Sequence, residues 1–146
     1  MNKTILLTGG AGYIGSHICL TLLDAGFNVF ILDSLENSSI KTINKLKKYL
    51  NQKRQKNIFE FFRGTITNLE IIEKIFDRSN YLSLPIDAVI HLAGLKSVSF
   101  SIKDPLNYWE NNVFGTINLL KVMDKFSCRT IVFSSSATVY GNFSKC

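Results

Sequence analysis

Five short, continuously apolar segments alternate along the chain with longer segments in which apolar residues recur every three or four positions. The apolar segments cover residues 4–8, 29–32, 58–62, 86–92 and 130–133. Apolar residues in unbroken runs are typical of strands that are buried on both faces, as in a parallel sheet. The alternation therefore predicts an α/β fold, a doubly wound parallel sheet with helices on both faces.

The periodic segments predict helices over residues 13–25, 39–54 and 68–78, and a fourth from Pro105 to about residue 120. The apolar positions expected to be buried in the first helix are Ile14, Ile18, Leu22 and Ala25. Those expected to share one face of the fourth helix are Leu106, Trp109, Val113, Ile117 and Leu120. With 146 residues, the chain fits one domain, residues 1–146.

Three glycines spaced by three residues, Gly9, Gly12 and Gly15, lie between the first strand and the first helix. A glycine-rich turn that opens a helix places free backbone N–H groups and the positive end of the helix dipole against an anion. The glycines permit a tight turn, close approach of a phosphate, and close packing of helix on strand. The turn predicts a site for the pyrophosphate of a dinucleotide, in a Rossmann-like fold.

A carboxylate follows the second predicted strand, where Asp33 lies 18 residues beyond Gly15. A carboxylate in this position accepts hydrogen bonds from the ribose hydroxyls of adenosine and repels a 2′-phosphate. Asp33 therefore predicts that the cofactor is NAD and not NADP. The alternative is a turn aspartate without a ligand.

The remaining strand ends meet at the same crevice in a doubly wound sheet. They contribute Gly64–Ile66, Leu92–Lys96 and Ser134–Ser136. The serines are either turn residues that satisfy backbone groups or hydroxyls that bond a substrate oxygen. We interpret His17 and His91 as structural, since neither has a nearby serine or cysteine arranged as a nucleophile.

Charge is unevenly distributed along the chain, which carries 17 basic and 11 acidic residues. No acidic residue lies between Glu36 and Glu60, and the basic residues of segment 41–56 accompany an apolar stripe. The stripe residues are Ile40, Ile43, Leu46 and Leu50. We interpret this segment as an amphipathic surface helix, and we expect no nucleic-acid partner because no nucleic-acid-binding motif accompanies it.

Other classes of protein are disfavoured by what the sequence lacks. No apolar run approaches the roughly 20 residues of a membrane span, and no secretory signal precedes the first strand. Cys19, Cys128 and Cys146 are widely separated and lack the spacing of metal ligands. We expect a cytoplasmic protein with reduced thiols, without a metal site or a membrane partner.

Four tracts of the chain carry a more specific signal than its pattern of strands and helices. The first is the glycine run from Thr8 to His17, which many sugar-nucleotide enzymes share. The more specific tracts are His91-Leu-Ala-Gly-Leu-Lys96, Asn111-Asn-Val-Phe-Gly-Thr116 and Ser134-Ser-Ser-Ala-Thr-Val-Tyr-Gly141. Together these tracts resemble the extended short-chain dehydrogenase/reductase family, and UDP-glucose 4-epimerase within it. The resemblance implies NAD-dependent interconversion of UDP-glucose and UDP-galactose through transient oxidation at C4, and a homodimer for the full-length enzyme.

The resemblance also assigns roles to individual positions. Backbone amides of Tyr13 and Ile14 would contact the pyrophosphate, and Ser136 would bond the reacting sugar hydroxyl as the catalytic serine. The residues implied along the adenosine are Asp33, Ser34, Asn37, Ser38, Thr65 and Ile66. Those implied on the nicotinamide side are Leu92, Ala93, Gly94, Lys96 and Asn111.

The sequence departs from the family pattern at two places. Thr65 stands where the family has an aspartate that bonds the adenine amino group, so we expect adenine binding weaker by about 1 kcal/mol. The catalytic Tyr-x-x-x-Lys pair is absent, because Ser144 follows Tyr140 at that spacing and Lys145 is one residue out of register.

The departures lead to two hypotheses. In the first, the chain is the NAD-binding part of UDP-glucose 4-epimerase, truncated after the fifth strand, without its C-terminal substrate domain and inactive by itself. A variant of this hypothesis makes it part of another NAD-dependent sugar-nucleotide epimerase or dehydratase. In the second, it is a non-catalytic NAD-binding module. In either case we expect the fifth strand to be an exposed edge.

Overall fold

A computed structural model describes residues 2–54, 56–136 and 139 of the chain. Its centre is a parallel sheet in the order β3-β2-β1-β4-β5, which confirms the predicted doubly wound fold. The strands are β1 (Thr4–Thr8), β2 (Asn28–Asp33), β3 (Phe59–Arg63), β4 (Ile86–His91) and β5 (Thr130–Phe133). Each strand lies within one or two residues of its predicted position, because unbroken apolar runs mark buried strands clearly.

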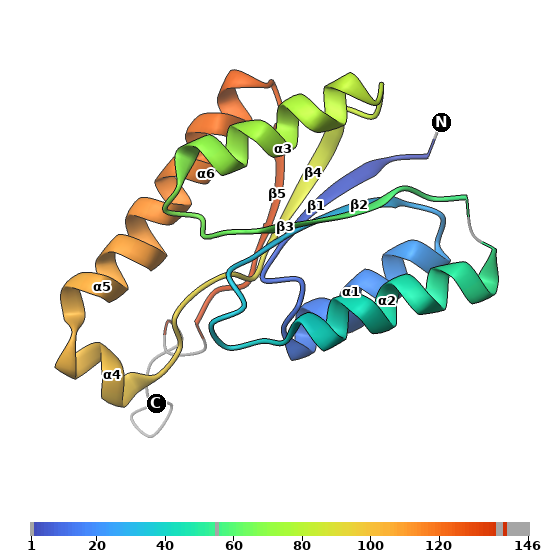
Figure 1. Ribbon diagram of the computed structural model, residues 1–146. Coiled ribbons are helices and arrows are strands. Elements are labelled where there is room, and N and C mark those ends of the chain that lie inside the picture. The colour runs from blue at the N-terminus through green and yellow to red at the C-terminus, as the bar shows by residue number, and fades with distance from the viewer. Residues whose placement is uncertain (1, 55, 137–138, 140–146) are drawn as a thin grey trace, which may run out of the picture.

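Two pairs of helices cover the two faces of this sheet (Figure 1). One face carries α1 (Tyr13–Asp24) and α2 (Ile40–Lys53), and the other carries α3 (Leu69–Tyr81) and α6 (Gly115–Lys125). Side chains alternate along a strand, so successive residues of β1 enter different cores. Leu6 packs toward α3 and α6, whereas Leu7 packs toward α1 and α2.

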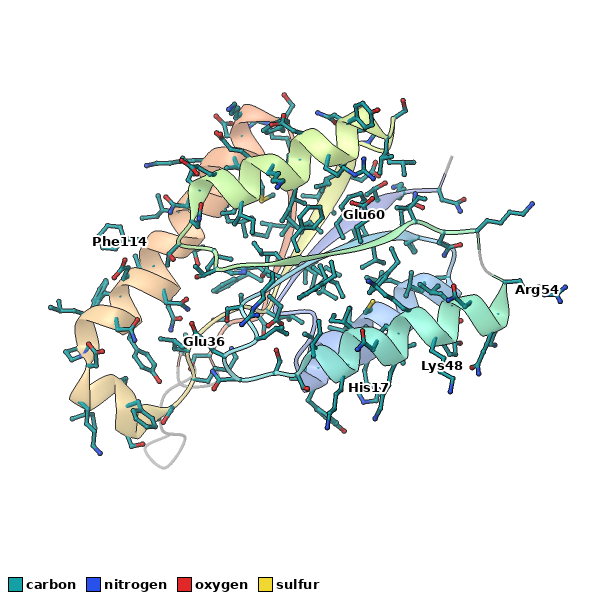
Figure 2. All side chains as sticks on the ribbon, in the orientation of Figure 1. His17, Glu36, Lys48, Arg54, Glu60 and Phe114 are labelled. Carbon is teal, nitrogen blue, oxygen red and sulfur yellow. The ribbon has the colours of Figure 1, made fainter. Side chains whose placement is uncertain are left out.

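The basic helix α2 confirms the predicted amphipathic surface helix. Ile43, Leu46 and Leu50 are buried, whereas Ile40 is exposed at the first turn. Lys48 and Arg54 point away from the sheet (Figure 2). The stripe was thus identified correctly except at its first residue.

The predicted buried face of α1 is wrong by one residue. Gly15, Cys19 and Leu23 are buried, whereas Ile14 is exposed. The reason is Gly15, where a Cβ atom would lie 2.3 Å from the Gly9 carbonyl oxygen. The absence of a side chain lets the helix approach the glycine turn closely, and this contact fixes which face is turned inward.

The predicted face of the fourth helix is also wrong, because this segment is not one helix. It consists of α5 (Pro105–Trp109), a π-helical turn (Glu110–Phe114, hereafter the π-turn) and α6. The predicted apolar positions, from Leu106 to Leu120, are all exposed. The buried residues are instead Gly115, Leu119, Val122 and Met123. A short helix, α4 (Val98–Lys103), precedes this segment and was not predicted.

The strand β5 lies at one edge of the sheet and pairs only with β4 among the described residues. Val132 and Phe133 are each more than half exposed. The expected exposed edge is therefore present in the described part of the chain. No helix within the described residues is long and apolar enough to cross a membrane.

Candidate functional site

A cavity lies at the carboxyl ends of β1, β2, β3 and β4, where the ligand site of a doubly wound sheet is expected. Together with the open solvent at its mouth, it has an empty volume of about 650 Å³. Twelve of the predicted cofactor residues line it: Gly9, Gly12, Asp33, Ser34, Asn37, Ser38, Thr65, Ile66, Leu92, Ala93, Gly94 and Asn111. The topology has thus brought four separate loops of the chain to one site.

The glycine turn forms the floor of this cavity through backbone contacts. Gly9 has a φ of 72°, and a Cβ atom there would lie 2.9 Å from the Ala93 nitrogen. The Gly9 N–H donates to the Leu32 carbonyl at 2.9 Å, and Gly12 begins α1 without a side-chain cap. The N–H groups of the first helical turn therefore remain available to an anion.

Asp33 connects the glycine turn to the loop that follows β2. Its Oδ2 accepts from the Ala11 N–H at 2.9 Å, and its Oδ1 accepts from the Leu35 N–H at 2.9 Å and the Ser38 hydroxyl at 2.8 Å. A carboxylate has about four acceptor sites, so one remains on Oδ2. Leu35 is held in a left-handed conformation, with a φ of 66°. Asp33 thus organises this wall of the cavity and keeps one acceptor site.

The end of β3 adds a neutral polar corner. Thr65 lines the cavity, and its hydroxyl accepts from the Thr67 N–H at 3.3 Å and lies 3.1 Å from the Thr67 hydroxyl. Ile66 is buried beneath it and packs against Gly115, where a Cβ atom would lie only 2.6 Å from Ile66 Cγ1. This corner presents a hydroxyl where the family pattern implies a carboxylate.

The loop after β4 is held by an amide clamp from the π-turn. The Asn112 Oδ1 accepts from the Leu95 N–H at 2.8 Å, and its Nδ2 donates to the Leu95 carbonyl at 2.9 Å. The Asn111 Nδ2 donates to the same Asn112 Oδ1 at 2.9 Å. The clamp therefore joins the loop after β4 to Asn111, which faces the cavity.

His91, at the end of β4, is buried behind this loop. Its Nδ1 lies 2.6 Å from the Thr8 hydroxyl oxygen, and its Nε2 lies 3.0 Å from the Thr116 hydroxyl oxygen. Burial, with a smaller contribution from the charge of Lys96, lowers the pKa of His91 from 6.5 to about 4. The imidazole is therefore neutral at pH 7, and both of its nitrogens have partners. The structural interpretation of His91 agrees with this arrangement.

Five predicted site residues do not line the cavity: Tyr13, Ile14, Gly15, Lys96 and Ser136. Gly15 lies behind the glycine turn as a packing residue. Lys96 lies near the rim, since a Cβ atom on Gly94 would be 3.9 Å from its Nζ. Ser136 is exposed at the end of the described strand segment. Their predicted contacts with cofactor or substrate stay predictions.

Gly64 and Leu95 belong to strand ends that the sequence already placed at the crevice, whereas sequence reasoning missed two lining residues, Leu32 and Glu36. Leu32 directly precedes Asp33 and Glu36 directly precedes Asn37, so extending each predicted loop by one position finds both. Glu36 has no motif signal, and it lies in the loop between β2 and α2 (Figure 2). His17, in contrast, projects outward from α1.

The sequence departure at Tyr140, Ser144 and Lys145 lies outside the described residues. No group of three or more His, Cys, Asp or Glu residues that could hold a metal ion occurs in the part of the chain that the structure describes. Cys19 and Cys128 are buried free thiols, and burial raises the pKa of Cys19 to about 12.

Known proteins resemble this chain in sequence over nearly its whole length. UDP-glucose 4-epimerases are among these relatives. A bifunctional UDP-glucose and UDP-xylose 4-epimerase of Pisum sativum is 45% identical over 140 residues, which are 96% of this chain and 38% of that protein. A UDP-glucose 4-epimerase of Bacillus subtilis is 43% identical over 137 residues, which are 94% of this chain and 38% of that protein. The chain thus spans well under half the length of these relatives.

Solved structures and a family model agree with these relatives. A UDP-glucose 4-epimerase of Bifidobacterium longum in complex with NAD⁺ and UDP has a TM-score of 0.83 at 38% identity, over 95% of this chain and 38% of that one. One from Stenotrophomonas maltophila with bound NAD and formylated UDP-arabinopyranose has a TM-score of 0.85 at 39% identity, over 99% of this chain and 40% of that one. A family model described as GDP-mannose 4,6 dehydratase matches residues 6–146. The chain therefore belongs to this family, and its sequence and fold are similar to those of UDP-glucose 4-epimerases.

Proposed function

We propose that the chain binds NAD in the cavity and forms the NAD-binding part of a UDP-glucose 4-epimerase. The observation that carries this proposal is the meeting of two features in one cavity. The glycine turn packs so closely that a Cβ atom at Gly9 or Gly15 would contact backbone at 2.9 Å or less, and Asp33 keeps a free acceptor site beside it. These features fit a dinucleotide with an unmodified ribose.

The charge of the cavity favours NAD over NADP. Asp33 and Glu36 both line it, and each would repel a phosphate on the adenosine ribose. In the proposed complex, the first turn of α1 holds the pyrophosphate, and Asp33 Oδ2 accepts from a ribose hydroxyl. Thr65 and Ile66 border the adenine, and Leu92, Ala93 and Gly94 border the nicotinamide. Lys96 and Asn111 approach the nicotinamide side from the rim and the π-turn.

Bound NAD would supply a hydride acceptor for oxidation at C4 of UDP-glucose or UDP-galactose. The residue of this chain that we assign to the sugar is Ser136, whose hydroxyl would bond the reacting oxygen. The 146 residues contain no Tyr-x-x-x-Lys spacing at Tyr140 to lower the barrier to proton removal. We therefore propose that this chain alone binds the cofactor without turnover, and that homodimer formation and a cytoplasmic location belong to the whole enzyme.

A non-catalytic NAD-binding module is the second candidate function. The departure at Tyr140, which Ser144 and not a lysine follows at the family's spacing, favours it, whereas the polar tracts around Lys96 and Ser136 serve no evident purpose in such a module. Both candidates predict binding of NAD, and they differ in whether UDP-sugars have any role.

Calorimetric titration of the 146-residue chain tests the proposal directly. We expect NAD to bind and NADP to bind at least tenfold more weakly. Asp33→Ala should remove most of this preference, whereas Asp77→Asn, at an exposed position of α3, should leave it unchanged. Failure of NAD to bind, or equal affinity for NADP, would contradict the proposal. Turnover of UDP-galactose by this chain would contradict its assignment as inactive.

A further inference from the structure

Four functional segments of the chain meet at His91. Its ring lies between Thr8, which precedes the glycine turn, and Thr116, which follows the π-turn. Its ring also packs against Phe133 at a centroid distance of 5.4 Å. Its carbonyl accepts from the Ser134 N–H at 3.1 Å, at the start of the serine tract. His91, at the end of β4, thus contacts the ends of β1 and β5 and the start of α6.

The hydroxyl protons around His91 determine which ring nitrogen carries hydrogen. Thr116 donates its one hydroxyl proton to the Asn112 carbonyl at 2.7 Å, so its oxygen can only accept from His91. Nε2 must therefore bear the proton. Nδ1 is then an acceptor, and Thr8 donates to it while accepting from the Ala93 N–H at 3.3 Å.

These bonds form one chain with a single direction. It runs from the Ala93 N–H through Thr8, His91 and Thr116 to the Asn112 carbonyl. At one end is the loop after β4, and at the other is the π-turn. The Asn112 side chain then returns to the same loop through its two bonds with Leu95. The result is a closed loop of hydrogen bonds around the nicotinamide side of the cavity.

We propose that His91, with its proton on Nε2, is a positioning residue that holds the loop after β4 and the π-turn together as one wall of the cofactor cavity. An apolar residue could fill the same volume but could not join Thr8 to Thr116. The opposite tautomer would place two acceptors, His91 Nε2 and the Thr116 oxygen, against each other. The importance of this wall for the cofactor rests on the proposed NAD site, whereas the tautomer and the closed loop of bonds do not.

The first test is independent of any ligand. In the full chain labelled with ¹⁵N at histidine, we expect the His91 Nε2 signal to be of the protonated, pyrrole type and the Nδ1 signal of the pyridine type. Thr116→Val keeps the shape but removes the acceptor, so it should mix the tautomers and speed exchange of the Leu95 amide. Thr116→Ser keeps the hydroxyl and should restore both properties. A proton on Nδ1 in the parent chain would overturn the inference.

The second test measures NAD affinity. Thr116→Val should weaken NAD binding about fivefold, the loss that corresponds to one net hydrogen bond, whereas Thr116→Ser should stay within about twofold of the parent. Thr21→Val is the matched control, because Thr21 makes the same kind of bond to the carbonyl four residues earlier on the exposed side of α1. It should leave the affinity unchanged.

The outcomes separate this inference from the proposed function. If the parent chain does not bind NAD, the proposed function fails, and the tautomer and the Leu95 exchange still decide the inference. If the parent chain binds NAD, and Thr116→Val binds it equally well with an unchanged tautomer of His91, the inference about His91 fails and the proposed function stands. If Thr116→Val does not fold, Thr116→Ser and the parent tautomer still give a decision, since loss of the Nε2 proton in either contradicts the chain of bonds.

Discussion

The two sides of the cavity are held by different kinds of interaction. On the side of β2, the carboxylate of Asp33 gathers two backbone N–H groups and a hydroxyl, and backbone packs on backbone at the glycine turn. On the side of β4, neutral side chains connect the loop to the π-turn through His91 and Asn112. The first side depends on a charge and on glycine, and the second on directed neutral hydrogen bonds.

This difference determines how each side tolerates change. A carboxylate accepts from donors at several angles, so the first side keeps its arrangement as long as the charge remains. A chain of hydrogen bonds through an imidazole needs one tautomer, so the second side is sensitive to a single misplaced proton. Glycine contacts differ as well, because Gly15 meets backbone atoms and Gly115 meets the Ile66 side chain.

Replacing the packing glycines Gly15 and Gly115 with alanine should give the largest difference in stability between the two sides of the cavity. In Gly15→Ala, the new Cβ would lie 2.3 Å from the Gly9 carbonyl oxygen, which cannot move without disrupting the turn. We expect a loss of more than about 3 kcal/mol in the free energy of unfolding. In Gly115→Ala, the Ile66 side chain can rotate away, and we expect a loss of about 1 kcal/mol. Urea denaturation measures both, and equal losses would contradict the distinction between backbone and side-chain contacts.

Neutralising Asp33 should have the second largest effect, a loss of stability on the charged side of the cavity. Asp33→Asn keeps the shape but replaces one acceptor oxygen by an NH₂ group, which then faces an N–H or O–H donor. We expect a loss of roughly 2 to 3 kcal/mol in the free energy of unfolding, since bonds to a charged acceptor are the stronger ones. Asp77→Asn on α3 is the control for a change of charge alone. A variant as stable as this control would show that Asp33 does not organise the wall.

Mild acid should destabilise the β4 side of the cavity, which is held by neutral hydrogen bonds through His91. Burial lowers the pKa of His91 from 6.5 to about 4, so the unfolded chain binds more protons than the folded chain between these values. Stability therefore falls as the pH falls through this window. Between pH 7 and pH 5, His91 should lower the free energy of unfolding by about 2 kcal/mol. Urea denaturation at both values measures it. His17→Gln should show the same loss, because it keeps the buried ring, whereas His91→Gln should show little of it.

The sequence predicted the sheet and most of the cavity because both depend on local signals. Unbroken apolar runs mark the strands, and the crossover topology brings their carboxyl ends together. Gly9, Gly12 and Asp33 were predicted to line the cavity, as they do, because the sequence places these residue types at the ends of its first two predicted strands. The clamp by Asn112 and the chain through His91 were not found, since nothing in the spacing shows which polar groups meet across 17 or 25 positions.

The helix faces were predicted less well for a reason that Gly15 and Gly115 share. Periodicity assigns the inward face to apolar residues, but in both helices the inward face contains a glycine that allows close packing. In α1 the error is one residue. In the segment after Pro105 the π-turn adds a further change of register that propensity does not reveal, and the helix before it, α5, buries none of its residues, including Leu106 and Trp109.

The π-turn also constrains the length of this segment over evolutionary time. Each residue advances an α-helix by about 100°, so removing one residue from Glu110–Phe114 would rotate Asn111 relative to α6 by that angle. Gly115 could then remain against Ile66 only if the asparagines turned away from the loop after β4. An insertion or a deletion in this segment would therefore break either the Gly115 contact or the Asn112 clamp, and we expect relatives to keep the number of residues here.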